Sequence, residues 1–150
     1  MPLLALSSHQ FEEYVLSPFL LGDFYHFLNW AFRNGMDISP VEVTLINLIP
    51  YVILLPALII SKARSERVFG IIFLFNNALT MANASFHIGI STAQNTFSPG
   101  MLSSLFFYIP LFVYAILLNK DIGLSNRPII AISLYGFIGH YVLIWLINIF

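Results

Sequence analysis

Hydrophobic runs separated by short polar segments dominate this chain, and their lengths predict membrane-spanning helices. An α-helix needs about 20 mostly apolar residues to cross the hydrocarbon core of a bilayer. Four runs reach that length, at residues 42–61, 67–91, 100–119 and 128–149. The pattern therefore predicts an all-α fold, a polytopic transmembrane helical bundle.

Two prolines interrupt the first of these spans. Pro50 and Pro56 lie within residues 42–61, and a proline in a helix interior removes a backbone hydrogen bond and bends the helix. We therefore expect a kinked first span, tolerated where a neighbouring helix satisfies the freed carbonyls.

The N-terminal stretch 3–34 is also largely apolar, but it predicts an irregular element. It contains Pro18, Gly22 and Asp23. Either one irregular helix forms here, or the element is broken or re-entrant, with one helix before Pro18 and a second from about Asp23. Irregular backbone at membrane depth survives only where protein or a wet cavity surrounds it. We expect this stretch to pack against the bundle, which then has about five helical elements.

The composition supports membrane insertion and narrows the possible functions. Hydrophobic residues make up 59% and charged residues 9% of the 150-residue chain, whereas soluble domains carry about 25% charged residues. The length suits one integral membrane domain, residues 1–150. A net charge of −1 without a basic patch argues against nucleic acid as a partner. The lack of cysteine excludes thiolate metal sites.

Basic residues predict the orientation of the spans. The loops 62–67 and 119–127 hold five of the six lysines and arginines, whereas the connection 92–99 holds no charge. Positively charged loops stay on the cytoplasmic side. We therefore expect the two basic loops inside and the uncharged connection outside.

A histidine and two glutamates stand close together near the N-terminus. If His9, Glu12 and Glu13 lie on a helix, spacings of three and four residues place all three side chains on or beside one face. Glutamate and histidine at this spacing supply metal ligands inside helical bundles. Carboxylates near lipid are costly unless they are paired, protonated or bound to a cation. We interpret these residues as a functional site, with Glu12 and Glu13 as candidate catalytic groups.

The second predicted span carries a polar stripe. Several members are spaced by three or four residues, and the set is Asn76, Asn77, Thr80, Asn83, Ser85 and His87. Lipid would leave the amides unsatisfied, so the stripe must face the bundle interior or a cavity. We expect His87 to be a metal ligand, and Asn83, Asn77 and Thr80 to support the ligands. The structural alternative is that the asparagines join helices through hydrogen bonds worth about 0.6 kcal/mol each.

Histidines in other apolar segments extend the candidate metal site. His26 follows Asp23 by three residues, and His140 lies near the middle of the last span. The full set of candidate ligands is His9, Glu12, Glu13, His26, His87 and His140. Imidazole and carboxylate without thiolate suit a divalent zinc, iron or manganese ion. Three or four of these side chains would hold one catalytic ion, and the full set could hold two.

Three motifs follow one another along the chain. They are His9-x-x-Glu12-Glu13-Tyr14, then Asn83-x-x-x-His87 in a hydrophobic helix, then Phe97-Ser98-Pro99-Gly100. In this order they resemble the HXXEE-domain family of small multi-span bacterial membrane proteins, over about residues 5–120, with Phe97 where the family usually has tyrosine. The resemblance implies a multi-pass protein of the bacterial inner membrane. Its motif suggests a metal-dependent enzyme without indicating the reaction.

Hydrolysis and oxidation are the reactions that such a metal site predicts. With one zinc ion, an open coordination position would carry a water of lowered pKa, and a glutamate that is not a ligand would serve as general base. With two irons, oxidation of an acyl or isoprenoid chain is expected. The substrate would be a membrane lipid or another hydrophobic small molecule entering from the bilayer. We favour the hydrolase slightly over the di-iron oxidase.

Two other classes of function fit the same residues. Intramembrane glutamate and histidine also serve as proton relays, so a proton-coupled small transporter is one alternative, and at this length it would need a homodimer. The other alternative is a non-enzymatic membrane assembly subunit, in which the polar stripe holds a partner helix. A stoichiometric metal ion would distinguish the enzyme from both.

One geometric condition decides whether a single site can form. In the predicted orientation, His87 lies toward the outer end of its helix, whereas a straight first helix that starts inside puts His9 near the cytoplasmic face. At 1.5 Å per residue, roughly 20–30 Å would then separate the two side chains. They meet only if the N-terminal stretch is broken or re-entrant, or starts outside.

Overall fold

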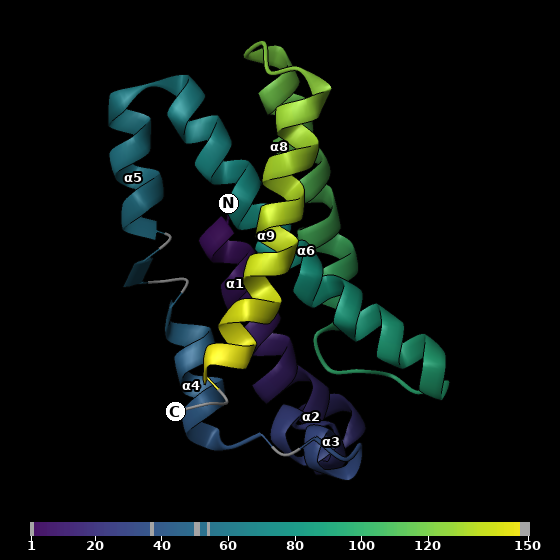
Figure 1. The fold of residues 1–150 in the computed structure, drawn as a ribbon. Coiled ribbons are helices and arrows are strands. Elements are labelled where there is room, and N and C mark those ends of the chain that lie inside the picture. Colours follow the sequence, from purple (N-terminus) through teal and green to yellow (C-terminus); the bar gives the residue numbers. More distant parts are fainter. Residues whose placement is uncertain (1, 37, 50–51, 54, 148–150) are drawn as a thin grey trace.

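The computed structural model describes residues 2–36, 38–49, 52–53 and 55–147, and every regular element in these ranges is helical (Figure 1). In chain order the elements are α1 (Pro2–Phe11), the π-helical segment η1 (Glu12–Leu16), α2 (Ser17–Leu21), the 3₁₀ segment η2 (Asp23–Tyr25), α3 (Phe27–Arg33), α4 (Pro40–Ile49), α5 (Leu55–Arg64), α6 (Glu66–Gln94), α7 (Met101–Ser103), the π-helical segment η4 (Ser104–Tyr108), α8 (Ile109–Asp121) and α9 (Asn126–Ile147). The predicted all-α fold class is confirmed.

The longest helix, α6, organises the bundle and packs against α5, α8 and α9. It begins after Ser65, whose hydroxyl accepts a hydrogen bond of 3.1 Å from the Val68 N–H and so satisfies one free donor of the first turn. It ends at Asn95, which adopts a left-handed conformation with φ of 51°, a conformation that asparagine tolerates better than most residues. Local signals in the sequence therefore set both ends of this helix.

The apolar core lies between α6, α8 and α9. Its buried residues include Phe73, Leu74, Ala115 and Ile129. A glycine lets α9 come very close to α6, because a Cβ on Gly136 would lie 2.5 Å from the Ala78 Cβ and 2.7 Å from the Phe75 carbonyl oxygen. Small residues at such crossings are the usual means of helix association in membranes.

The N-terminal stretch is broken, as one of the two predicted alternatives requires. The segments α1, η1 and α2 follow one another without interruption from residue 2 to residue 21, and Pro18 lies within this helical run. The break falls at Gly22, whose φ is 93°, and η2 and α3 follow it. The helical run points toward the same end of the bundle as the C-terminal half of α6 (Figure 1). The first helix can therefore meet that half of α6.

The predicted first span, residues 42–61, is divided between two helices. Helix α4 ends at Ile49 and α5 begins at Leu55. Pro56 lies within α5. Pro50, the other predicted kink, lies outside the described residues.

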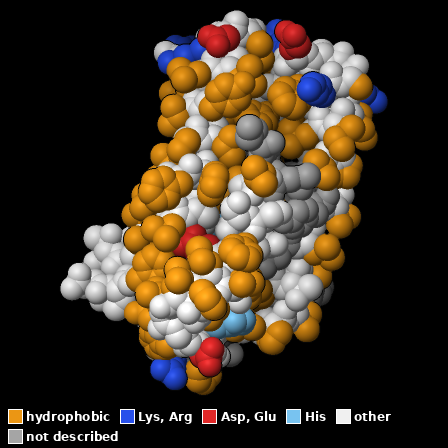
Figure 2. All heavy atoms as spheres, turned by 180° about the vertical axis from the view of Figure 1, so that it is seen from behind, with side chains coloured by type: hydrophobic (Ala, Val, Ile, Leu, Met, Phe, Trp, Pro, Cys, Tyr) orange, Lys and Arg blue, Asp and Glu red, His pale blue; other side chains and the backbone are white. Residues whose placement is uncertain are grey.

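Three helical stretches are long and apolar enough to cross a membrane, at residues 66–94, 101–121 and 126–146. They coincide with the last three predicted spans apart from a few residues at their ends, and residues 148 and 149 lie outside the described part of the chain. On the face shown in Figure 2, hydrophobic side chains cover much of the surface, and the charged side chains lie at the two ends apart from one acidic group near the middle. These features indicate a multi-pass membrane protein.

Candidate metal centre

Two histidines from different helices approach one carboxylate in the interior of the bundle. The Glu13 Oε1 lies 3.4 Å from the His9 Nε2 and 3.4 Å from the His87 Nε2. The ligand atoms of the three residues all lie within 4.8 Å of one another, and all three residues are buried. Within the described part of the chain, these are the His, Asp and Glu side chains that come close enough to share an ion.

A serine hydroxyl fixes the orientation and the protonation of the His9 ring. The His9 Nδ1 lies 2.8 Å from the Ser103 Oγ, whose hydroxyl donates to the Gly100 carbonyl at 3.1 Å. Where the Ser103 hydroxyl donates its one hydrogen to Gly100, its Oγ accepts from the His9 Nδ1–H. The Nε2 of His9 then carries the lone pair, and the Asn83 amide nitrogen donates to it at 3.0 Å.

The His87 ring is held in the same way by a second serine. Its Nδ1 lies 3.0 Å from the Ser98 Oγ, and the Ser98 hydroxyl contacts the Pro99 carbonyl at 3.4 Å. The Ser98 N–H in turn donates to the Ser91 Oγ at 2.9 Å, which ties the loop after α6 back to that helix. Both rings direct their Nε2 toward Glu13, and a histidine whose Nδ1–H is held by a hydroxyl offers its Nε2 to a metal ion.

The backbone of Gly100 lies very close to all three candidate ligands. A Cβ at this position would lie 2.5 Å from the His9 Cε1, 3.0 Å from the His87 Cε1 and 3.2 Å from the Glu13 Oε1. The φ of Gly100 is 89°, a backbone conformation that favours glycine. The sequence thus needs glycine here both for the turn and for the close approach.

Helical spacing and one reversed loop bring these groups together. His9 and Glu13 are four residues apart across the junction of α1 and η1, and His87 lies in the C-terminal half of α6. The loop that follows α6 reverses at Asn95 and lays Ser98 against the His87 ring. The two π-helical segments, η1 and η4, both adjoin the site. Such segments occur frequently at functional sites.

Aromatic rings enclose the three candidate ligands. The Tyr108 ring centroid lies 4.8 Å from that of His9, and the rings of Phe86 and Phe27 lie 5.2 and 6.2 Å from that of His87. Among the described residues, the ion-pair partners of Glu13 are the two histidines, and no lysine or arginine pairs with it. A buried carboxylate beside neutral imidazoles is costly unless a proton or a cation offsets its charge.

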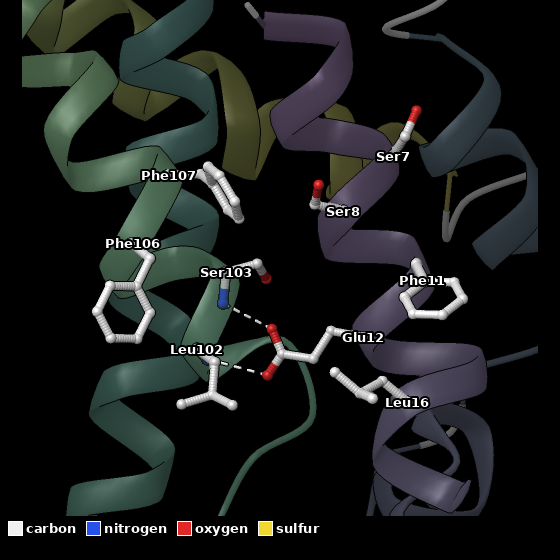
Figure 3. A pocket seen from close by; sticks show the side chains of 9 residues that line it. All are labelled: Ser7, Ser8, Phe11, Glu12, Leu16, Leu102, Ser103, Phe106 and Phe107. Atoms are coloured by element: carbon white, nitrogen blue, oxygen red, sulfur yellow. Dashed lines mark hydrogen bonds between the residues drawn. The ribbon is translucent and has the colours of Figure 1, made fainter.

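Glu12 points toward Leu102 and Ser103 of the neighbouring helix (Figure 3). Its Oε1 accepts from the Leu102 N–H at 2.9 Å and its Oε2 from the Ser103 N–H at 2.6 Å. These donors belong to the first turn of the helix that starts at Met101, where free N–H groups and the helix dipole favour a carboxylate. Of the two adjacent glutamates, Glu13 therefore faces the imidazoles, and Glu12 caps the neighbouring helix.

The other two predicted histidine ligands lie outside this group. His26 lies between η2 and α3, with its ring 5.3 Å from that of Tyr14. His140 lies in α9, with its ring 5.5 Å from that of Tyr141. The structure thus brings together three of the six predicted ligands.

The polar stripe of α6 is largely buried, as predicted, but its members have different partners. Asn76, Asn77 and His87 are among the buried residues of this helix. Asn83 contacts the His9 Nε2, the same atom that faces Glu13. Asn77 and Thr80 instead donate to carbonyls of their own helix, at 2.7 and 3.1 Å.

Three further residues of the site were not predicted as site residues. Ser98 and Gly100 lie in the Phe97–Gly100 motif, so the sequence held a signal for them without indicating their roles. Ser103 carried no such signal, because it lies 94 residues from His9 along the chain and only the fold brings the two together.

The ligand atoms have the separations that a single ion requires. Zinc binds imidazole nitrogen and carboxylate oxygen at about 2.0–2.2 Å in tetrahedral geometry, which places neighbouring ligand atoms roughly 3.3–3.6 Å apart. The two Nε2–Oε1 separations of 3.4 Å match this spacing. Two histidines and one carboxylate occur as ligands in zinc hydrolases and in iron oxygenases, and in both cases positions remain open for water or substrate.

The fold and this group define a multi-pass helical membrane protein with a candidate metal centre. The chain matches the HXXEE family model, described as "Protein of unknown function with HXXEE motif", over residues 1–115. It therefore belongs to the HXXEE family. No curated protein and no solved structure matches the chain.

Proposed function

We propose that this protein is a metal-dependent membrane enzyme in which His9, Glu13 and His87 bind one divalent ion and a lipid or another hydrophobic molecule is the substrate. The observation that carries the proposal is the convergence of two imidazole Nε2 atoms on one buried carboxylate oxygen. A divalent cation would offset the buried negative charge and bind the Glu13 oxygen and both Nε2 atoms, at His9 in place of the contact with the Asn83 amide. The candidate spans support a location in a membrane, for which we propose the bacterial inner membrane.

Hydrolysis is the reaction that we favour. An ion held by three protein ligands keeps a position for water, and zinc lowers the pKa of that water to about 7. The protein's own residues hold the ion, orient its ligands through Ser103 and Ser98, and exclude bulk water with the aromatic wall. The same three ligands also suit a single iron ion, which would favour oxidation. A di-iron site would need ligands beyond these three.

Metal content tests the proposal. We would purify the wild type, Glu13→Gln and Glu12→Gln in detergent, equilibrate each with zinc, iron(II) or manganese, and measure bound metal by elemental mass spectrometry. We expect about one ion per chain in the wild type, loss in Glu13→Gln and retention in Glu12→Gln. Glu12→Gln is the matched control because both glutamates are buried and adjacent, and only Glu13 faces the imidazoles.

A wild-type protein that stays folded and monodisperse but binds none of the three metals would overturn the proposal. Proton transfer through Glu13 would then be the better explanation of the buried group. If metal binds, turnover is tested by incubating the loaded protein with phospholipid, acylglycerol or isoprenoid lipids and identifying products by mass spectrometry. Products that form equally with Glu13→Gln would argue against catalysis at this site.

A further inference from the structure

A groove of about 450 Å³ lies between the α1–η1 helix and the α7–η4 helix (Figure 3). The first helix contributes Ser8, Phe11 and Glu12 to its lining, and the second contributes Leu102 and Phe106. The volume lies within the range of about 300–1,000 Å³ that is typical of small-molecule sites. The geometry points to a binding site for the acyl chain of a membrane lipid in this groove.

The groove opens on the surface that faces the bilayer. Phe11, Leu102 and Phe106 are 54%, 41% and 71% exposed, respectively. They belong to helices that lie in or beside a candidate span. In a multi-pass protein, exposed apolar side chains of this kind contact lipid tails. A lipid chain can therefore enter the groove sideways, without passing through water.

The charge of the lining selects the apolar part of a lipid over its headgroup. Among the described residues that line the groove there is no lysine or arginine, and Glu12 lies in its wall. A phosphate or a free carboxylate would lie next to the Glu12 carboxylate without a compensating cation. Both oxygens of Glu12 already accept backbone N–H groups of Leu102 and Ser103. An uncharged chain therefore fits this wall without leaving a polar group newly unpaired.

The groove lies directly beside residues that adjoin the candidate metal group. Ser103 lines the groove and also holds the His9 Nδ1 at 2.8 Å, and Glu12 directly precedes Glu13. A bound chain would thus contact two residues that adjoin the ligands. The identification of this lipid as the substrate rests on the proposed function, whereas the binding of a chain in the groove does not.

Photocrosslinking tests the groove. The wild type would be reconstituted in vesicles of phosphatidylethanolamine that carries a diazirine in one acyl chain, and the labelled residues would be mapped by peptide mass spectrometry. We expect labels to concentrate at the groove, on Phe11 above all, and to fall several-fold there in Leu102→Trp, whose larger side chain fills the space. Leu105→Trp is the matched control, because Leu105 is 40% exposed on the same helical run and does not line the groove.

Two outcomes separate the groove from general lipid contact. The proposal is overturned if Phe11 is labelled no more strongly than Ile138 and Trp145, which are exposed on α9, and if Leu102→Trp leaves this labelling unchanged. Such a result would show contact with annular lipid only. If Leu102→Trp does not fold, Ser8→Phe fills the groove from the facing helix and must give the same loss.

Metal content measured on the same samples separates the two proposals. Protein that binds metal but shows only annular labelling overturns the groove alone. Protein that is labelled in the groove but binds no metal overturns the metal centre and leaves the groove standing.

Discussion

The two halves of α6 use buried polar side chains in different ways. In the first half, amides donate to backbone carbonyls of the helices themselves. The Asn77 amide bonds to the Phe73 carbonyl at 2.7 Å, and Asn119 of α8 bonds to the carbonyls of Gly70 and Ala115, both at 2.8 Å. Each of these donor bonds ends on a carbonyl that already belongs to a helix, so the amides join helices and do not converge on one point.

In the second half of α6, Ser85 and Thr92 also bond to carbonyls of their own helix, but Asn83 and His87 bond to side chains from other segments. Asn83 contacts His9 of the first helix, and His87 contacts Ser98 of the following loop and Glu13. These bonds orient two ring nitrogens and a carboxylate oxygen toward one point. Burial does not distinguish the halves, since Asn77 and His87 are both 1% exposed. The kind of partner distinguishes them. Residues that join helices bond to backbone carbonyls, and residues that build the site bond to side chains from other segments.

The largest effect is expected from Gly100→Ala. Its Cβ would lie 2.5 Å from the His9 ring, and because the clash reaches all three ligands, stoichiometric metal binding should be lost. The loss should exceed the 10–100-fold decrease in affinity that is typical when a residue supporting a metal ligand is removed. Elemental mass spectrometry on the purified variant checks this expectation.

Gly123→Ala is the control for backbone strain. The φ of Gly123 is 82°, and a Cβ there meets nothing within 4 Å. Both substitutions place an alanine in a left-handed conformation at a cost of roughly 1–2 kcal/mol, but only one of them reaches the ligands. Equal metal binding by the two variants would contradict the proposed centre.

A smaller effect is expected from Ser103→Ala. This substitution removes the acceptor of the His9 Nδ1–H, and the loss of such a partner lowers metal affinity by about 10–100-fold. Ser104→Ala is the matched control, because the Ser104 hydroxyl bonds to the same Gly100 carbonyl at 2.7 Å and does not hold a histidine. Competition with a chelator measures both affinities, and a similar decrease in the two variants would mean that the His9 contact has no separate role.

The spans were predictable from the sequence because each is governed by local chemistry. Residues 66–94, 101–121 and 126–146 are long apolar runs, and in α6 a serine cap and a left-handed asparagine mark the two ends. The N-terminal stretch was harder, since both a proline and a glycine could break it. The break falls at Gly22, whose φ is 93°, whereas the helical run continues past Pro18, which follows the π-helical segment Glu12–Leu16.

The site was only partly predictable because its selection depends on tertiary contacts. Helical spacing places Glu12 and Glu13 roughly 100° apart on the same helix, and nothing local indicates which one meets a histidine. The structure decides this through its neighbours, since the start of α7 binds Glu12 and His87 approaches Glu13. The sequence likewise places Asn77 on one polar stripe with His87. In the structure, however, the Asn77 amide bonds to a carbonyl of its own helix.

The smallest effect is expected from Asn119→Leu. Asn119 lies in α8 and bonds to the first half of α6. The substitution removes two donor bonds to helix carbonyls, and it also removes an Oδ1 that is buried without a hydrogen-bond partner. Interhelical hydrogen bonds of this kind average about 0.6 kcal/mol in membranes, and the loss of the unpaired oxygen offsets part of that. The free energy of unfolding in detergent should therefore change by no more than about 0.6 kcal/mol. Metal affinity, measured with the same chelator, should not change; a decrease as large as that of Ser103→Ala would mean that both halves of α6 belong to one coupled network.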